Sequence, residues 1–443
     1  MSRICVIGAG CVGLVTAAVF AELGHLVTVV DTDLVKVRAL KKDILPVYEP
    51  DLKDIWLRNR VSGRLHVTGK YQEALHDADF AFITVGTPSA RNGKPNLRSI
   101  RQAARGIASQ ADSSLIVVIK STVPPGTAAV VAGLLGKNKG AFEFPVVSNP
   151  DFMRKGTAVF DFQHPYRIAL GGSSTGAVQA VAELYRSMDA AVVTCDNITA
   201  EMSKYASNVF IATRMGLMNE LSGICEKYDA DILKMAEIIS EDPRYGVAYL
   251  DSGLGYGGHD VSKDLLGLIH AAGKIGLLSP ILTAVHKVQQ RQPKLIVNKL
   301  KELLGNLEGK TIGLLGLTCK PGSDEMRDAP SLSLISLLQK HGCSVRAHDP
   351  LVKVLTSGNF PGTTLCEDVY DLAGGCDALL LVTEWIQFKD IDFTLLAERM
   401  NRRILIDGRN FYRPAELRKA GFIYGGIGIP RRNHEMLAGV AVR

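Results

Sequence analysis

Two polar side chains suited to stabilising negative charge stand four positions apart near the middle of the chain. Lys204 and Asn208 fall in a segment with helical character, so both would project from one face of the helix. An ammonium and a carboxamide on that face could converge on a developing alkoxide or oxyanion, and such stabilisation usually dominates catalysis. The alternative is an ordinary solvated helix face.

A second group of polar residues follows several glycines. Residues 255–264 read Gly-Tyr-Gly-Gly-His-Asp-Val-Ser-Lys-Asp. Asp260 and Asp264 could each take up a proton or position a water, and Lys263 stands directly beside Asp264. His259 beside Asp260 is either half of an acid/base pair or a loop histidine with no role.

A glycine-rich turn near the start has the spacing of a dinucleotide-binding motif. The β-branched run 3–7 leads into Gly8, Gly10 and Gly13, and the next apolar run ends at Asp31. In such a unit the glycines permit a tight turn, close approach of a pyrophosphate and close packing of helix on strand. The acid would bind the adenosine ribose and repel a 2′-phosphate, so the pattern predicts NAD. A glycine turn without a ligand is the alternative.

Polar residues also follow two further apolar runs that we expect to be strands of the same sheet. Thr87 follows the run 80–85, and Ser121 and Thr122 follow the run 115–119. Because ligands of parallel sheets bind outside the carboxyl ends of the strands, we expect these hydroxyls to face the cofactor. Helix N-capping is a second, compatible role.

The C-terminal part of the chain predicts a second parallel sheet. Four short apolar runs are separated by helix-length segments, at residues 310–316, 344–348, 378–382 and 403–407. The length of 443 residues indicates two or three domains, at about 150 residues each. We therefore expect an α/β protein with two Rossmann-like parallel-sheet domains.

Composition argues against several other classes of protein. No run approaches the about 18 apolar residues of a membrane span, and the start of the chain shows no export signal. Eight scattered cysteines favour buried thiols in a cytoplasmic protein over disulfides or a metal site. The net charge of +6 is spread out, so we expect neither a nucleic-acid nor a membrane partner.

Several ordered stretches resemble the UDP-glucose/GDP-mannose dehydrogenase family along nearly the whole chain. Residues 255–264 resemble the active-site loop of that family, Gly-Phe-Gly-Gly-Ser-Cys-Phe-Pro-Lys-Asp. Other stretches are similar to further family signatures, at residues 47–50, 120–127, 148–156, 201–220, 320–331 and 407–410. The combination is specific, although no single stretch is.

The resemblance implies three parts and a nucleotide-sugar substrate, with UDP the favoured nucleotide. Residues 1–196 would form the NAD-binding domain, 197–300 a helical connector that forms a homodimer, and 301–443 an α/β domain that binds the nucleotide diphosphate. The connector would contain a long central helix with Lys204 and another long helix from about residue 261 to the Pro293 region. The implied activity is NAD-dependent oxidation of a CH–OH group.

Together, the residue patterns and the resemblance define a candidate site. Its catalytic candidates are Lys204, Asn208, Asp260, Asp264, Asp151 and Thr122. Its candidate cofactor contacts are Gly8, Gly10, Val12, Gly13, Asp31, Lys36, Thr87, Ser121, Thr122 and Arg327. Its candidate substrate contacts are Phe152, Met153, Lys204, Asn208, Arg244, Tyr249, Gly257, Lys320 and Arg409. The resemblance implies that Arg244 reaches the substrate of a neighbouring subunit. For each arginine, phosphate binding competes with a role in a surface ion pair.

The chain departs from the family pattern where the family carries its chemistry. The family's cysteine traps an aldehyde as a thiohemiacetal, so that a second hydride leaves and a thioester forms; Asp260 holds that position here. A carboxylate is a much poorer nucleophile toward carbonyls than a thiolate. All of residues 259–262 differ from the family's Ser-Cys-Phe-Pro, while Asp151 replaces a glutamate and Lys155 a second acid. The clustered differences indicate natural divergence.

Four readings remain open for a nucleotide-activated sugar or related nucleoside. The favoured one oxidises a primary alcohol to the aldehyde or its hydrate with one hydride, and Lys204, Asp264 or Asp260 is the base. The second is epimerisation through bound NAD. The third is full oxidation to the uronic acid, with Asp260 positioning water. The fourth is a catalytically silent binding protein, which the retained Lys204, Asn208, Lys263 and Asp264 argue against.

Overall fold

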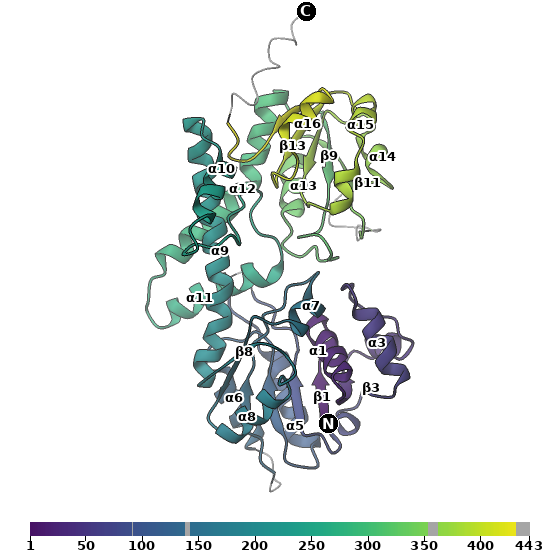
Figure 1. Cartoon of the computed structure of the whole chain (residues 1–443), viewed down its shortest axis with the longest axis vertical. Coiled ribbons are helices and arrows are strands. Elements are labelled where there is room, and N and C mark those ends of the chain that lie inside the picture. Colours follow the sequence, from purple (N-terminus) through teal and green to yellow (C-terminus); the bar gives the residue numbers. More distant parts are fainter. Residues whose placement is uncertain (91, 138–141, 353–361, 431–443) are drawn as a thin grey trace, which may run out of the picture. The chain divides into compact units, whose positions relative to one another are not determined.

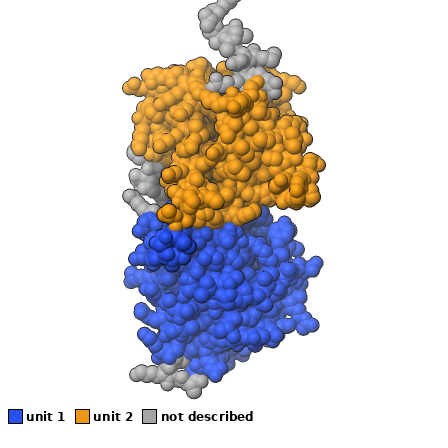
Figure 2. All heavy atoms as spheres, turned by 90° about the vertical axis from the view of Figure 1, so that its left-hand side faces the viewer, with its two compact units in different colours: residues 1–207, 266–277 blue, residues 208–265, 278–443 orange. Residues whose placement is uncertain are grey.

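The computed structural model describes residues 1–430 apart from residues 91, 138–141 and 353–361. The side chain of His259, the candidate partner of Asp260, also lies outside the described part. The chain divides into two compact units, residues 1–207 with 266–277 and residues 208–265 with 278–443 (Figure 2). The predicted division after residues 196 and 300 stays a prediction.

The first unit is built on an eight-stranded sheet with the order β3-β2-β1-β4-β5-β6-β7-β8. Figure 1 labels β1, β3 and β8 of this sheet. Its strands are β1 (Arg3–Ile7), β2 (Leu26–Val30), β3 (Leu65–Thr68), β4 (Phe80–Ile83), β5 (Ile116–Ile119), β6 (Val146–Ser148), β7 (Arg167–Gly172) and β8 (Ala191–Cys195). Only the pairing of β6 with β7 is antiparallel among these described strands. Alternate residues of β1 pack into two different cores, so the sheet is covered on both faces.

Eight helices accompany this sheet in the described part of the first unit. They are α1 (Cys11–Glu22), α2 (Leu34–Lys41), α3 (Leu52–Val61), α4 (Tyr71–Leu75), α5 (Arg98–Gln110), α6 (Thr127–Leu135), α7 (Ala158–Gln163) and α8 (Thr175–Glu183). Helix α1 packs against α3 and α7, while α5 packs against α6. The glycine turn therefore leads into a helix that is buried among its neighbours.

Four further helices follow, and the first confirms the predicted central helix. Helix α9 (Asn197–Tyr228) contains 32 residues, including Lys204. It is followed by α10 (Ile232–Ser240), α11 (His259–Lys274) and α12 (Pro280–Leu304). The prediction of one long helix from about residue 261 to the Pro293 region is wrong. The chain breaks between α11 and α12, where Gly276 has a φ of +75°, and Pro293 lies inside α12.

The second unit contains a six-stranded parallel sheet with the order β11-β10-β9-β12-β13-β14. Its strands are β9 (Thr311–Leu315), β10 (Ser344–His348), β11 (Thr363–Leu365), β12 (Ala378–Leu381), β13 (Ile404–Asp407) and β14 (Ile423–Gly425). The helices that connect these strands are α13 (Pro330–Lys340), α14 (Val369–Ala373), the 3₁₀ helix η1 (Ile386–Asp390), α15 (Phe393–Arg399) and α16 (Pro414–Lys419).

Counted in chain order within each sheet, the first six strands of both sheets follow the same 3-2-1-4-5-6 order. That order is typical of dinucleotide-binding Rossmann folds. The predicted fold class, with two Rossmann-like parallel sheets and a long central helix, is therefore confirmed. Within the described ranges, no helix combines the length and the apolar character that a bilayer span requires.

Candidate active site

The glycine turn of the first unit leaves room for a phosphate. Gly8 has a φ of +111°, and a Cβ on Gly13 would overlap the carbonyl oxygen of Gly8. A Cβ on Gly10 would instead meet no described heavy atom within 4 Å, so the backbone there faces open space. Gly10 is also the N-cap of α1 and supplies no side-chain cap. The first N–H groups of α1 thus suit the pyrophosphate of NAD.

The predicted ribose-binding acid lies against this turn. Asp31 accepts hydrogen bonds from the backbone N–H groups of Ala9 and Asp33, each at 2.8 Å. These bonds fix the carboxylate at the end of β2, beside the glycine turn. Val12 in the first turn of α1 and Lys36 in α2 are half-buried. The residues present therefore fit the diphosphate and ribose of NAD.

The hydroxyl groups after β4 and β5 connect the two loops that carry them. The Thr87 hydroxyl donates to the carbonyl oxygen of Thr122 at 2.7 Å. The Ser121 hydroxyl donates to a carbonyl of the loop after β4, also at 2.7 Å. The N-caps of the next described helices, α5 and α6, are Leu97 and Gly126. These hydroxyls therefore link loops at the carboxyl edge of the sheet rather than cap those helices.

Lys204 is buried in the first unit beside the loop after β6. Its Nζ lies 5.6 Å from the centroid of the Phe152 ring, and the guanidinium of Arg167 lies 3.8 Å from the same centroid. A pocket of about 10 Å³ adjoins Lys204, lined by Ile119, Ser121, Thr122, Val123, Ser148, Pro150, Glu201 and Lys204. Asp151 is buried nearby and accepts a hydrogen bond from the N–H of Met153 at 2.8 Å. The structure thus gathers Thr122, Phe152 and Lys204 in the first unit.

Two buried glutamates accept backbone hydrogen bonds in this region, and neither is among the predicted site residues. Glu201 accepts hydrogen bonds from the N–H groups of Gly126 and Ala128, at 2.6 and 2.7 Å, at the start of α6. Burial raises the pKa of Glu201, although these N–H bonds act in the opposite direction. Glu49 in the same way caps the start of α7. Only the match of both segments to family signatures could have indicated them, because their partners are far away in the sequence.

In the second unit, polar and charged side chains contact one another at the start of α11. The amide of Asn208 donates to the fully buried Asp264 carboxylate at 2.6 Å. The Nζ of Lys263 lies 3.8 Å from Asp264 Oδ1 and 3.9 Å from Asp260 Oδ1. The Asp260 side chain is 56% exposed, whereas that of Lys263 is 8% exposed. The arrangement leaves one carboxylate accessible to a ligand or water and holds the other inside.

The glycine loop before α11 packs against a thiol. A Cβ on Gly257 would lie 3.1 Å from the Cβ of Cys319 and 2.9 Å from Cδ of Pro330. The buried Cys319 thiol donates to the carbonyl oxygen of Arg327 at 3.3 Å. Sequence patterns do not reveal this neighbour of the loop, since Cys319 lies in a different segment.

The Arg409 side chain holds the same glycine loop. It donates to the carbonyl oxygens of Gly255 and Val382, both at 2.8 Å, and its Nε lies 3.2 Å from Glu384. The predicted substrate contact at Arg409 thus has a structural role here, because two of its donor atoms connect the loop to the end of β12.

Two other predicted ligand contacts form ion pairs with nearby acids. Arg327 pairs with Glu325 and Arg244 pairs with Asp242, each with a shortest distance of 2.5 Å. The hydrogen bond that Arg327 donates to the Glu325 carboxylate raises the pKa of Arg327. Both arginine side chains are largely exposed. The ion-pair alternative therefore describes both arginines in this structure, and their contacts to ligands remain predictions.

The remaining two predicted substrate contacts are half-buried. Lys320 accepts a hydrogen bond from the Thr318 hydroxyl at its backbone oxygen, at 3.3 Å. Tyr249 has a φ of +62°, which is uncommon for a bulky residue and marks a sharply bent backbone.

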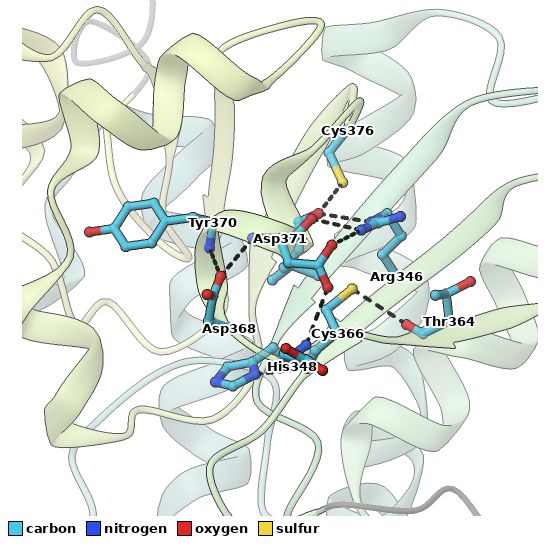
Figure 3. Close-up of polar contacts among 10 residues, drawn as sticks. Arg346, His348, Thr364, Cys366, Asp368, Tyr370, Asp371 and Cys376 are labelled. Atoms are coloured by element: carbon cyan, nitrogen blue, oxygen red, sulfur yellow. Dashed lines mark hydrogen bonds and ion pairs between the residues drawn. The ribbon is translucent and has the colours of Figure 1, made fainter.

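Another polar cluster of the second unit has a structural explanation. Arg346 of β10 donates to the carbonyl oxygen of Asp371 at 2.7 Å and pairs with its carboxylate at 2.7 Å. Figure 3 draws these contacts as dashed lines. The Cys376 thiol donates to the carbonyl oxygen of Leu372 at 3.0 Å. Asp368 caps the N-terminus of α14. These bonds satisfy the ends of a short helix, so we assign no chemistry to the cluster.

The sulfur atoms and carboxylates do not gather into a metal centre in the described part of the chain. No group of three or more His, Cys, Asp or Glu residues there could hold a metal ion. All eight cysteines lie in that part as thiols; six are buried, and Cys11 and Cys195 are half-buried.

A glycine turn suited to NAD, a Rossmann strand order and buried polar groups on α9 and α11 define an NAD-dependent oxidoreductase. Three profiles of the UDP-glucose/GDP-mannose dehydrogenase family match the chain: the NAD-binding domain at residues 2–189, the central domain at 198–291 and the UDP-binding domain at 313–414. The chain belongs to this family of nucleotide-sugar dehydrogenases, which act on CH–OH groups.

Curated relatives and solved structures agree with this assignment. UDP-glucose 6-dehydrogenase of Pseudomonas aeruginosa is 40% identical, with 98% of each chain covered. UDP-glucose 6-dehydrogenase TuaD of Bacillus subtilis is 36% identical, with 97% of this chain and 94% of that protein covered. A UDP-glucose dehydrogenase structure from Pyrobaculum islandicum has a TM-score of 0.89 at 34% identity, covering 97% of this chain and 98% of its own.

Proposed function

We propose that this enzyme oxidises the primary alcohol of a UDP-sugar to the aldehyde, or its hydrate, and stops after one hydride. The observation that carries the proposal is the carboxylate of Asp260 in the first turn of α11, 3.9 Å from Lys263. The family resemblance places a thiol at this position. A carboxylate does not capture an aldehyde as a stable covalent adduct, so the product is released at that stage.

The substrate class follows from the relatives and from the match to a UDP-binding domain. Relatives with 40% and 36% identity are UDP-glucose 6-dehydrogenases, which makes UDP-glucose the first substrate to test. UDP-sugars with other hexoses form a comparison series. The predicted contacts of Arg244, Tyr249, Lys320 and Arg409 with the sugar nucleotide belong to this proposal.

The proposed reaction converts RCH₂OH and NAD⁺ into RCHO, NADH and one proton. NAD⁺, which the turn of Gly8, Gly10 and Gly13 would hold, would supply the hydride acceptor. Lys204 and Asn208, one turn apart on α9, stabilise the alcohol oxygen as its proton leaves. The buried Asp264 orients Asn208 through their 2.6 Å hydrogen bond. The proton passes to Lys204, Asp264 or Asp260.

The number of NADH molecules formed per UDP-sugar consumed tests the proposal. One NADH supports it, and two NADH contradict it. No NADH together with an isomeric product indicates epimerisation, whereas no NADH and no product indicates a binding protein. The Cys319→Ser variant is the matched control. If wild type forms two NADH and this variant forms one, the thiol packed against Gly257 captures the aldehyde.

Full oxidation to the uronic acid is the second candidate. The exposed Asp260 carboxylate beside Lys263 could position water, and the relatives named above are 6-dehydrogenases. Conversion of RCH₂OH to RCOO⁻ would consume two NAD⁺ and one water and release three protons with two NADH. In that case Asp260→Asn should suppress the second NADH and preserve the first.

We also propose that the chain forms a homodimer through α9. Phe210, Leu217 and Ile224 recur at seven-residue spacing on this helix, and they are 67%, 57% and 49% exposed. Such a stripe of apolar side chains is typical of a helix face that packs against a partner.

The buried thiols suit a reducing compartment, which supports the cytoplasm as the location.

A further inference from the structure

A buried lysine of the first unit has no part in the mechanism proposed above. Lys120 directly follows β5, and its side chain points into the interior. Its Nζ donates to Asn149 Oδ1 at 3.2 Å and to the Tyr185 hydroxyl at 3.3 Å. It also lies 5.0 Å from the centroid of the Phe162 ring and 5.6 Å from that of the Tyr185 ring. An ammonium is therefore held by two neutral oxygens and two aromatic faces.

Asn149 connects this ammonium to the loop that carries Asp151. Its Oδ1 accepts hydrogen bonds from Lys120 and from the Tyr185 hydroxyl, the latter at 2.5 Å. Its Nδ2 donates to the carbonyl oxygen of Ala169 in β7 at 3.1 Å. The Asn149 side chain is thus fixed from three sides, and Asp151 lies only two residues further along the backbone.

The same loop supports Lys204. Phe152 follows Asp151, and its ring lies 5.6 Å from the Nζ of Lys204. A cavity of about 40 Å³ opens beside the loop, and its polar lining includes Lys120, Asn149, Asp151, Asp161, Arg167 and Tyr185. Lys120 and Asp151 therefore border one small space that is large enough for water.

Few charged groups lie near Lys120, and they shift its pKa in opposite directions. Burial lowers the pKa of the Lys120 ammonium from 10.5 to about 8; the Asp151 carboxylate raises this pKa, and the Lys204 ammonium lowers it. The other charged groups that border the cavity are Asp161, which is paired with Arg154, and Arg167. Asp151 is thus the carboxylate whose charge acts on Lys120.

We propose that Lys120 is a positioning residue of the active site: its ammonium anchors the segment Asn149–Phe152 and so orients the Asp151 carboxylate and the ring beside Lys204. The inference rests on the proposed function for the roles of Asp151 and Lys204. Lys120 itself acts only through these residues.

Three substitutions test the role of Lys120. Lys120→Met removes the charge while keeping an unbranched chain, and Asn149 and Tyr185 can still bond to each other. Lys120→Arg keeps a charge at all accessible pH values. Tyr185→Phe removes one oxygen acceptor and leaves the charge. Lys137→Met is the matched control, because Lys137 is exposed.

Steady-state kinetics with UDP-glucose should show a loss of kcat of about 100-fold in Lys120→Met, as expected when a reacting group is misplaced. The KM for NAD should stay within about twofold of wild type, because β4 and β5 lie between β1, which leads into the glycine turn, and β6, which leads into this loop. In wild type, kcat should fall as pH rises through about 8, where Lys120 loses its charge. This alkaline limb should be absent in Lys120→Arg if that variant is active.

Hydrogen exchange provides a readout that does not depend on turnover. In Lys120→Met, exchange of the backbone amides of residues 149–157 should be about tenfold faster, the equivalent of one charge-assisted hydrogen bond. Exchange in α5 should be unchanged. Tyr185→Phe should show the same effect, but smaller. This variant still tests the anchoring if the lysine variants fail to fold.

The two experiments separate the possible failures. If wild type oxidises no UDP-sugar, the proposed function fails, and hydrogen exchange still tests the anchoring by Lys120. If Lys120→Met and Tyr185→Phe fold with unchanged exchange at residues 149–157, the inference is overturned. It is also overturned if active Lys120→Met keeps the wild-type kcat and alkaline limb.

Discussion

Asp260 is the residue on which the predicted product depends. Its carboxylate lies in the first turn of α11, close to the buried Lys263 ammonium, and its own side chain is exposed. An ion pair of this kind can hold water or exchange a proton, but it lacks a nucleophilic sulfur. The chemistry after the first hydride transfer therefore depends on what else can reach the aldehyde.

The variant Asp260→Cys should gain the second oxidation. A thiol beside Lys263, at the N-terminus of a helix, is expected to be partly ionised and therefore nucleophilic. NADH formed per UDP-glucose should rise from one toward two, and intact-protein mass spectrometry should detect an acyl adduct in a rapidly quenched reaction. Asp260→Ser is the control. An unchanged product from Asp260→Cys would show that position 260 does not decide the outcome.

Lys120 should make the stability of the enzyme depend on pH. Its pKa is lowered from 10.5 to about 8 in the folded protein, so the folded chain binds fewer protons between these two values. The cost of burying the ammonium is therefore full below pH 8 and disappears as pH rises toward 10.5. At pH 7 it is about 3 kcal/mol, from the pKa difference alone.

The effect of Lys120→Met on stability should therefore be most favourable at neutral pH, where wild type carries the full cost of burying the ammonium. Relative to wild type, its free energy of unfolding should fall by about 2 to 3 kcal/mol between pH 7 and pH 10. Urea denaturation at both pH values measures the difference, with Lys137→Met as the control. A difference between Lys120→Met and wild type that is independent of pH would mean that Lys120 is not a buried ammonium.

At the scale of elements, α9 is attached to the first sheet domain by Glu201. This carboxylate accepts two N–H groups at the start of α6 and lies one turn before Lys204. Glu201→Gln places an amide donor against one of those N–H groups. We expect a loss of about 1 to 3 kcal/mol in unfolding free energy, because a buried N–H loses its acceptor. Thermal denaturation measures it, and the exposed Glu183→Gln, with no expected change, is the control.

The activity of Glu201→Gln tests the same element. If Glu201 sets the position of α9, kcat should fall more than the affinity for NADH, which we predict to bind at the glycine turn of α1. Equal losses of kcat and NADH affinity in folded protein would argue that Glu201 stabilises the whole first unit and has no special link to Lys204.

The elements that could be predicted are those with local signals. The glycine spacing 8-10-13 and Asp31 predicted the start of the first sheet, and eight apolar runs marked strands now seen. The break between α11 and α12 was missed, because the family resemblance suggested a continuous helix and a single glycine was not decisive. Glu201, Lys120 and Cys319 were not recognised as site neighbours, since their partners lie in distant segments and only folding brings them together.

At the scale of the whole molecule, the exposed stripe on α9 predicts a dimer. Leu217→Asp places a charge in the middle of the stripe, where Phe210 and Ile224 flank it at seven-residue spacing. Light scattering after gel filtration should give twice the chain mass of 47.8 kDa for wild type and a single chain mass for the variant. A monomeric wild type would contradict the prediction.

If Arg244 contacts the substrate of a neighbouring subunit, the loss of the dimer should also raise the KM for UDP-glucose. Arg244→Ala in the dimer should reproduce that rise without a change in mass. A monomeric Leu217→Asp enzyme with wild-type KM would restrict the substrate contacts to one chain.

The oxidation state of the product tests the central claim most directly. UDP-glucose labelled with ¹³C at the primary alcohol carbon is incubated with the unmodified enzyme and excess NAD⁺, and the product is followed by ¹³C NMR. We predict the signal of an aldehyde hydrate at the labelled carbon, which persists while NAD⁺ remains. A carboxylate signal that grows with no lag and accounts for the consumed substrate would contradict the account.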